Sequence, residues 1–303
     1  MDLLPREVVD INPPTGVDLV LSEQGSDWLW AVTAIYILSF VSIPTRLDYK
    51  QLPPDMRILT LPAQFVCLVP SFTAPENKRV FNYTLSMALL VGAVTYFAQA
   101  SDLGWSAVEE ANGLTRQLFY ARYINWAVSF PALLLSLGLL SGVSWTTIIL
   151  NIFISWFWIL SYLAAAYTVS SYKWGFFAFG TFAYVILVMS TLNESRGSAQ
   201  ALGIGRDYMI LSCWVNLLWL LYPVAFGLSD GGHVIGVTGG FIFFGALDVL
   251  LLPVAAVGFL VLSRNWDFAR LQLDFSDYRG FRRGDGLPDK GNLPAGGEAG
   301  TRG

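Results

Sequence analysis

Residues 236–262 have the sequence GVTGGFIFFGALDVLLLPVAAVGFLVL, in which Asp248 is the only charged side chain. A helix that crosses a membrane needs about 20 consecutive, mostly apolar residues, and this run is longer than that. A carboxylate inside such a segment is costly, so it is usually paired or functional. The run therefore predicts a membrane helix with a polar site inside it.

The rest of the chain has a matching composition. Of its 303 residues, 54% are hydrophobic and 13% are charged, and the mean hydropathy is +0.54. Soluble domains carry about 25% charged residues. The net charge of -4 argues against a nucleic-acid partner. Cys67 and Cys213 lie in apolar runs without metal-ligand spacing, so we expect neither a disulfide scaffold nor a metal site.

Further apolar runs, separated by short polar breaks, bring the expected number of transmembrane helices to seven. The expected helices span residues 26–43, 80–98, 117–140, 145–169, 173–193, 207–227 and 236–262. The predicted fold class is thus an all-α membrane protein, a seven-transmembrane-helix bundle. Residues 1–25 are expected to form an N-terminal tail, residues 26–262 the helical domain, and residues 263–303 a disordered tail.

The placement of Lys and Arg predicts how the bundle is oriented. If the N-terminus is outside, 14 of the 18 cations fall in the cytoplasmic loops and the C-terminal tail. Arg6, Arg116 and Lys173 lie on the opposite side, and Arg122 lies within a helix. The positive-inside rule therefore predicts an extracellular N-terminus and a cytoplasmic C-terminus.

Residues 41–64 do not fit a simple span. When they are removed, residues 28–40 join residues 65–72 into one apolar run of full membrane length. Val-Ser and Gln at the borders can be encoded by GTGAGT and CAG, the usual ends of an intron. One hypothesis is that residues 41–64 are a translated intron or a gene-model artefact. The alternative is a genuine re-entrant or interfacial hairpin.

Arg122 and Asp248 are predicted to form an electrostatic pair in the bundle interior, either directly or through water or a tyrosine hydroxyl. Arg122 is the only cation expected within the membrane, and no third charge is expected beside the pair. The alternative is that the pair only fixes helix packing, because buried ion pairs are weak evidence of activity.

Several motifs resemble those of microbial rhodopsins. Residues 120–126 (YARYINW) resemble the third helix of that family, residues 219–231 (WLLYPVAFGLSDG) the sixth, and residues 246–250 (ALDVL) the seventh. Residues 95–98 and 172–175 are similar to its fungal branch. The motifs occur in the right order on the expected helices, so the resemblance implies a microbial rhodopsin-like bundle.

The departures from the family bear directly on function. The family's retinal lysine corresponds to Leu252, the pump's proton acceptor to Asn125 and its later donor to Ser136. A Schiff base requires a primary amine, and the four lysines are expected in loops or the tail. They are Lys50, Lys78, Lys173 and Lys290. We therefore expect no covalent retinal and no other cofactor.

Leu252 and Asn125 together remove one charge of each sign, which leaves Arg122 against Asp248 and keeps the core neutral. This pattern resembles the fungal opsin-related proteins of the 30-kilodalton heat-shock membrane protein type. That resemblance implies plasma-membrane residence, responsiveness to stress, and a chaperone-like or proton-ATPase-regulating role. It does not imply light-driven transport. Because the sequence shows no constellation of residues for hydrolysis, phosphoryl transfer or hydride transfer, we predict no enzyme activity.

Seven residues fall where the family lines its chromophore pocket. They are Tyr96, Trp126, Phe130, Gly175, Trp219, Tyr222 and Phe226. The pocket either persists as an apolar cavity or has collapsed into a packed core. Phe130 and Leu252 add bulk and favour collapse, whereas Gly175 replaces an aromatic and favours a gap. We expect His233, the only histidine, to be a solvated loop residue.

Three functional classes remain open from the sequence. The first is regulation of other membrane proteins, such as the plasma-membrane proton ATPase, or action on lipid. The second is a retinal-independent ion or proton conductor using Arg122 and Asp248, and the third is an apolar-ligand carrier or sensor. Small residues at 164–166 and 236–240 favour close helix packing and are compatible with a homo-oligomer.

Overall fold

The computed structural model describes residues 11–42, 76–110, 113–263 and 266. This part of the chain forms a bundle of seven long helices. They are α2 (Glu23–Ser42), α3 (Glu76–Ala100), α4 (Tyr120–Ser141), α5 (Trp145–Tyr167), α6 (Lys173–Met189), α8 (Gly205–Phe226) and α9 (Val237–Leu262). Short π-helical turns extend two of them, η4 (Ser190–Glu194) after α6 and η5 (Gly227–Gly231) after α8, and α7 (Ser195–Ala201) follows η4.

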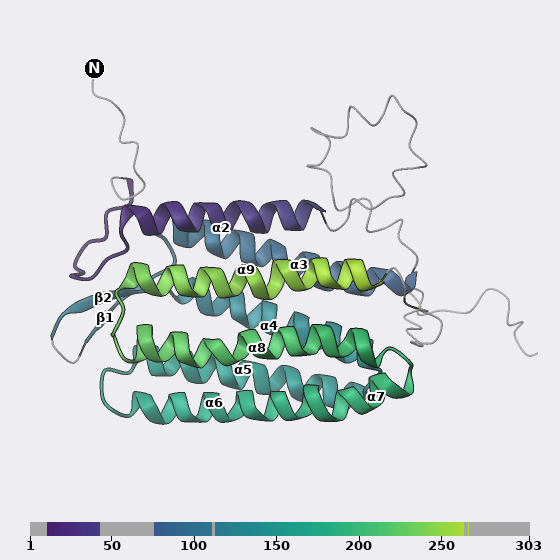
Figure 1. Cartoon of the computed structure of the whole chain (residues 1–303). Coiled ribbons are helices and arrows are strands. Elements are labelled where there is room, and N and C mark those ends of the chain that lie inside the picture. The colour runs from purple at the N-terminus through teal and green to yellow at the C-terminus, as the bar shows by residue number, and fades with distance from the viewer. Residues whose placement is uncertain (1–10, 43–75, 111–112, 264–265, 267–303) are drawn as a thin grey trace, which may run out of the picture. The chain divides into compact units, whose positions relative to one another are not determined.

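The helices form a closed ring. Each helix from α2 to α6 packs against the next, α6 packs against α8, α8 against α9, and α9 against α2. Figure 1 shows α2, α9, α8 and α6 nearer to the viewer and α3, α4 and α5 behind them. Because the ring closes, every long helix has one side toward a shared interior, where polar side chains from several helices can meet.

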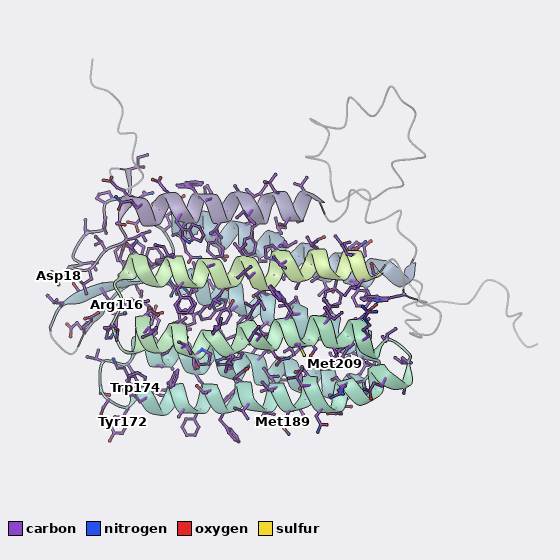
Figure 2. All side chains as sticks on the ribbon, viewed as in Figure 1. Asp18, Arg116, Tyr172, Trp174, Met189 and Met209 are labelled. Carbon is purple, nitrogen blue, oxygen red and sulfur yellow. The ribbon has the colours of Figure 1, made fainter. Side chains whose placement is uncertain are left out.

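Six helical segments in the described part are long and apolar enough to cross a membrane. They are Val80–Ala100, Tyr120–Ser141, Trp145–Tyr167, Lys173–Ala201, Gly205–Gly231 and Val237–Leu262. α2, with Glu23 and Asp27 in its first turns, is the seventh helix of the ring. Apolar side chains cover the outer face of α6, and Figure 2 shows Met189 pointing away from the bundle there. Such a face is suited to contact with lipid.

Local sequence signals explain the break between α4 and α5. Gly142 follows α4 with a φ of 69°, in the left-handed region that favours glycine, and its N–H donates to the carbonyl of Gly138. Two residues later, the Ser144 hydroxyl accepts a hydrogen bond from the Thr147 N–H at 3.2 Å and caps α5. A short turn between antiparallel helices results.

A β-hairpin that the sequence analysis did not predict lies between α3 and α4. Strand β1 (Ser106–Glu109) pairs antiparallel with β2 (Thr115–Leu118). The N-terminal segment adds to it: the Leu19 N–H donates to the Thr115 carbonyl, and the Leu19 carbonyl accepts from the Gln117 N–H. Part of the expected N-terminal tail is therefore docked on the bundle, and α2 begins at Glu23.

At the other end of the bundle, Trp266 lies beyond the boundary expected at residue 263. Its indole N–H donates to the Asp207 carboxylate at 2.9 Å, and its ring contacts Phe81 and Phe259. The buried Trp266 thus belongs to the helical domain. Residues 43–64 of the hypothetical insertion lie outside the described residues.

Gly180 on α6 gives a direct test of how closely α5 and α6 pack. A methyl group there would lie 2.6 Å from Cδ1 of Tyr162 and 3.2 Å from Cδ1 of Trp158, both of which are buried. We expect Gly180→Ala to lower the free energy of unfolding by about 1–3 kcal/mol, because the neighbouring rings are pinned by further rings. Thermal unfolding in detergent measures this change.

Gly175→Ala on the same helix is the matched control. A methyl group at Gly175 meets no atom within 4 Å, so the variant should unfold at the wild-type temperature or slightly above it. Equal destabilisation by both substitutions would contradict the close α5–α6 contact.

Candidate functional site

Asp248, in the middle of α9, is the centre of a buried hydrogen-bond cluster. Its side chain accepts hydrogen bonds from the hydroxyls of Tyr96 on α3 and Tyr222 on α8. The Trp126 indole N–H donates at 3.0 Å and the Asn125 amide at 3.3 Å, both from α4. Asp248 is 2% exposed, so these four neutral donors replace the water that the carboxylate would otherwise need.

Tyr36 brings α2 into the same cluster. Its buried hydroxyl donates to the backbone carbonyl of Asp248 at 3.1 Å, and its ring packs on Tyr96. Five helices therefore meet at Asp248, which supplies both its side chain and its backbone as acceptors. We call these six residues the Asp248 cluster; its other members are Tyr36, Tyr96, Asn125, Trp126 and Tyr222.

Arg122 forms no direct ion pair with Asp248, which corrects the direct form of the sequence-based prediction. Its Nη1 lies 3.2 Å from Oδ2 of Asp230 in η5, and its guanidinium lies over the rings of Phe241 and Phe244. Within the described part of the chain, no cation forms an ion pair with Asp248.

The reason for this correction is depth in the bundle. Arg122 lies in the first turn of α4, whereas Asp248 lies 11 residues into α9. At about 1.5 Å per residue, that places Asp248 roughly 16 Å from the start of its helix. Asn125 and Trp126, one turn further along α4 than Arg122, are the residues that reach it.

Asp230 is another buried carboxylate and joins several elements. It is 5% exposed and accepts hydrogen bonds from Arg116 at 2.9 Å, Arg122 at 3.2 Å and the Tyr123 hydroxyl at 2.9 Å. Arg116 comes from β2, so the unexpected hairpin brings a second buried cation into the bundle. The sequence analysis expected no third charge beside Arg122 and Asp248. The structure adds two buried charged groups, Asp230 and Arg116.

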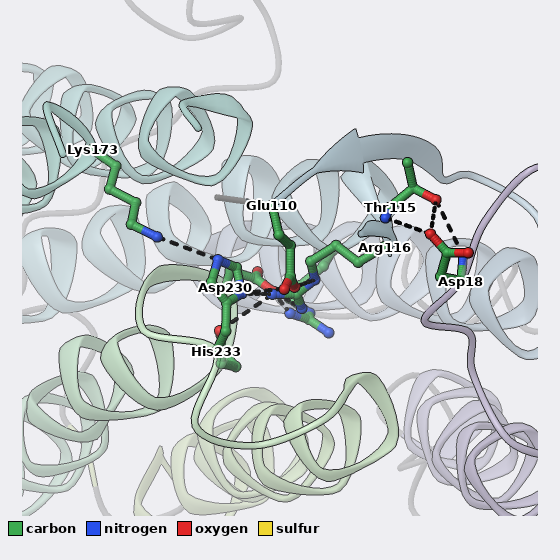
Figure 3. A network of polar contacts seen from close by, with 9 residues as sticks. Asp18, Glu110, Thr115, Arg116, Lys173, Asp230 and His233 are labelled. Atoms are coloured by element: carbon green, nitrogen blue, oxygen red, sulfur yellow. Dashed lines mark hydrogen bonds and ion pairs between the residues drawn. The ribbon is translucent and has the colours of Figure 1, made fainter. Parts of the chain in front are cut away.

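Arg116 links Asp230 to the end of the bundle that carries the hairpin (Figure 3). Its Nη1 lies 2.6 Å from Nδ1 of His233, and its Nε lies 3.9 Å from the Glu110 carboxylate. The Lys173 ammonium lies 3.3 Å from Nε2 of the same histidine. We call Glu110, Arg116, Lys173, Asp230 and His233, with Arg122 and Tyr123 behind them, the hairpin-end network.

His233 is thus not the solvated loop residue expected from the sequence. Its side chain is 27% exposed and contacts charged groups on both ring nitrogens. Partial burial lowers the pKa of His233, and the nearby Arg116 guanidinium lowers it further, against the opposing effect of Glu110.

Aromatic rings fill the interior beside the Asp248 cluster. Phe130, 1% exposed, has its ring centroid 5.2 Å from those of Trp158, Trp219 and Tyr222, and 6.1 Å from that of Trp126. These distances are those of rings in direct contact. Of the two possibilities for the pocket, a packed core is the one that this arrangement supports.

The other residues expected at the pocket occupy different places. Phe226 is buried against Tyr162 and Phe177, with ring centroids 4.5 and 5.7 Å away. Unlike the other residues expected at the pocket, Gly175 is not buried: it is exposed on α6, where an added methyl group would meet open space. It leaves no gap in the core, and its assignment to the pocket is corrected. Leu252 is buried on α9.

Ser136 does not lie in either network. It is fully buried on α4, and its hydroxyl has no hydrogen-bond partner among the described residues. It therefore adds neither a charge nor a link to the Asp248 cluster, which contains Asn125 as the other substituted pump position.

Comparisons with known proteins show which family has this seven-helix fold. The chain matches the family model described as bacteriorhodopsin-like protein over residues 57–261. It is 33% identical to the opsin-like protein carO of Fusarium fujikuroi over 286 residues, which cover 90% of this chain and 85% of that protein. It is 30% identical to a 30 kDa heat shock protein of Saccharomyces cerevisiae, with 88% and 81% covered.

A solved structure with the same fold is that of the light-driven proton pump LR (Mac) from Leptosphaeria maculans. Its TM-score is 0.69 at 26% sequence identity, and the match covers 84% of this chain and 99% of the pump. The seven-helix ring is therefore shared along nearly the whole length of that protein.

Double-mutant cycles test which carboxylate Arg122 contacts. We expect a coupling free energy of about 0.5–3 kcal/mol between Arg122→Gln and Asp230→Asn, because the two side chains form a buried pair at 3.2 Å. The cycle of Arg122→Gln with Asp248→Asn should give a clearly smaller coupling. Unfolding free energies in detergent provide the readout. A larger coupling to Asp248 would contradict the pairing described above.

Proposed function

Since this chain belongs to the bacteriorhodopsin-like protein family, we propose that it is a member without photochemistry that regulates or protects other membrane proteins under stress. It is a multi-pass integral membrane protein with the rhodopsin fold. The observation that carries the proposal is the packed aromatic core around Phe130, together with a buried leucine, Leu252, at the retinal-lysine position.

The residues of this chain do not fit a covalently bound retinal. Leu252 has no amine to form a Schiff base, and Lys173, a lysine within the described residues, contacts His233 at the hairpin end. A flat conjugated chain between two ring faces needs about 7 Å between their planes, twice the usual contact distance. The ring of Phe130 is in contact with both Trp126 and Trp219, with centroids 6.1 and 5.2 Å away. The same packing disfavours an apolar-ligand carrier.

The contacts of Asp248 and Asp230 also disfavour a conductor based on Arg122 and Asp248. Asp248 is surrounded by neutral donors, and Arg122 is held by Asp230 and two aromatic rings. A conducting path would need groups that exchange protons or ions in sequence along the bundle. Here each charged group is engaged by fixed partners, which is the expected design of a structural core.

Regulation is the role that the relatives suggest. One curated relative bears the name 30 kDa heat shock protein and others the name opsin-like protein, and none of these names describes an enzyme. These names support stress-related action without catalysis, and we further propose residence in the plasma membrane, which the sequence resemblance implies. The first partner to test is the plasma-membrane proton ATPase, and the surrounding lipid bilayer is the medium in which the contact forms. Self-association into a homo-oligomer is part of the same proposal.

Addition of all-trans retinal tests the absence of photochemistry. We expect neither the wild type nor Leu252→Lys to give a visible absorption band or a borohydride-reducible adduct by mass spectrometry. The amine alone does not suffice, because the ring of Phe130 packs against both Trp126 and Trp219. Leu252→Lys combined with Phe130→Ala is expected to yield the adduct. A pigment from the wild type would overturn the proposal, and one from Leu252→Lys alone would contradict the packed core.

Co-reconstitution tests the regulatory role. A purified fungal plasma-membrane proton ATPase, placed in lipid vesicles with an equal amount of this chain, should change its rate of ATP hydrolysis and proton uptake about twofold or more. The Leptosphaeria maculans pump, kept in the dark, is the control of the same fold. Identical ATPase rates with both proteins would contradict the regulatory role for this partner.

Vesicles that contain this chain alone distinguish the conductor. Under an imposed pH gradient, their proton leak should equal that of empty vesicles. A leak that Asp248→Asn abolishes would favour the conductor over the regulator.

A further inference from the structure

His233 lies where three separate parts of the bundle end meet. Its own loop follows η5, Arg116 and Glu110 belong to the hairpin, and Lys173 begins α6. The backbone of His233 has a φ of 55°, which is uncommon for a residue other than glycine. Its N–H is fixed to the Ser229 carbonyl at 2.9 Å. The imidazole is therefore held in place by contacts on several sides.

Both ring nitrogens of His233 face cations. Nδ1 lies 2.6 Å from Nη1 of Arg116, and Nε2 lies 3.3 Å from Nζ of Lys173, while the Glu110 carboxylate approaches Nδ1 at 3.2 Å. A neutral imidazole has one lone pair and can accept from one of the two cations. A protonated imidazole has none, so it presents N–H groups to a guanidinium and an ammonium.

We propose that His233 is a proton-operated clasp: in its neutral form Nδ1 accepts from Arg116 and so holds the hairpin to the loop after η5, and the contact opens when the imidazole is protonated. Opening means that His233 leaves Arg116 and Lys173. The proton is the ligand, and no other group is required.

The surrounding charges decide the direction of this switch. Arg116 and Lys173 oppose protonation, whereas Glu110 and the more distant Asp230 favour it. Asp230 is already shared by Arg116 and Arg122, so its charge is largely engaged. Asp18, on the N-terminal segment, bonds to Thr115, and the first three turns of α9 carry no ionisable side chain. The neutral form therefore belongs to the closed clasp.

The pH dependence follows from this assignment. Burial and Arg116 lower the pKa of His233 in the closed clasp, while in the open clasp the exposed ring has its ordinary value of about 6.5. The open form thus binds the proton more tightly. The clasp is closed above that value and opens progressively as the pH falls through the interval between the two pKa values.

Opening would reach further into the bundle through Arg116. The same guanidinium that contacts His233 donates to Asp230, which in turn binds Arg122 and Tyr123 on α4. A change at His233 is therefore transmitted to the first turn of α4 by direct contacts, whereas the Asp248 cluster has its own separate donors.

Nuclear magnetic resonance on histidine-labelled protein tests the clasp directly, because His233 is the only histidine of the chain. Full-length protein without a histidine tag, labelled with ¹³C and ¹⁵N histidine in lipid nanodiscs, gives one imidazole signal. We expect it to titrate below pH 6.5. Titration at or above that value would overturn the proposal.

Hydrogen exchange, corrected for its intrinsic pH dependence, measures opening. Exchange in residues 106–118 and 228–236 should rise by at most about tenfold per pH unit within the transition, as expected for one linked proton. His233→Gln should remove this dependence. Equal pH dependence in wild type and His233→Gln, or none in the wild type, would contradict the clasp.

Neighbouring substitutions sharpen the assignment. Glu110→Gln should shift the titration of His233 to lower pH, and Lys173→Gln should shift it to higher pH. Glu109→Gln is the matched control, because Glu109 is exposed on the hairpin one residue before Glu110. An equal shift from both glutamates would show a general charge effect and overturn the role of Glu110. These measurements use the isolated protein, so their outcome is independent of whether the chain regulates an ATPase.

Discussion

A carboxylate buried in a bundle of apolar helices must be surrounded by hydrogen-bond donors, and this constraint organises the interior of the protein. Asp248 meets it with donors from α3, α4 and α8, and its backbone carbonyl accepts from α2. Losing one of these donors would leave the carboxylate with an unsatisfied oxygen, because water cannot take the donor's place in the buried interior. The cluster therefore fixes the mutual depth of five helices and, through Trp126 and Tyr222, the position of the rings that pack on Phe130.

The division of charge between the two carboxylates explains how the core tolerates a leucine at the retinal-lysine position. Asp248 is served by neutral donors, one of which is Asn125, so it needs no cation in contact. Arg122 and Arg116 both turn to Asp230, which they share with the Tyr123 hydroxyl. The arrangement therefore differs from the balance of Arg122 against Asp248 inferred from the sequence: the cations pair with Asp230 near the bundle end, and the deeper carboxylate is stabilised by hydrogen bonds from neutral donors.

Sequence reasoning located the helices well, because apolar length is a strong signal: α5 was expected from residue 145 and α9 from residue 236, and they begin at Trp145 and Val237. It missed the hairpin, although Asn112-Gly113 between two short alternating segments is a recognised turn signal. That omission placed Arg116 in a loop and left Arg122 with Asp248 as its apparent partner. Which charged side chains pair depends on their depth in the bundle and on how the loops fold, and the hydrophobic periodicity of a sequence reports neither.

The two clusters differ in how they can respond to their surroundings. The Asp248 cluster is enclosed by buried tyrosines, an indole and an amide, none of which changes its charge near neutral pH. The hairpin-end network contains a partly exposed imidazole between a guanidinium, an ammonium and a carboxylate. Since a bundle with a packed aromatic core has little freedom to rearrange in its middle, a signal is more readily received at the end where separate chain segments are joined by titratable contacts. The packed core supplies the rigid frame against which such contacts can open and close.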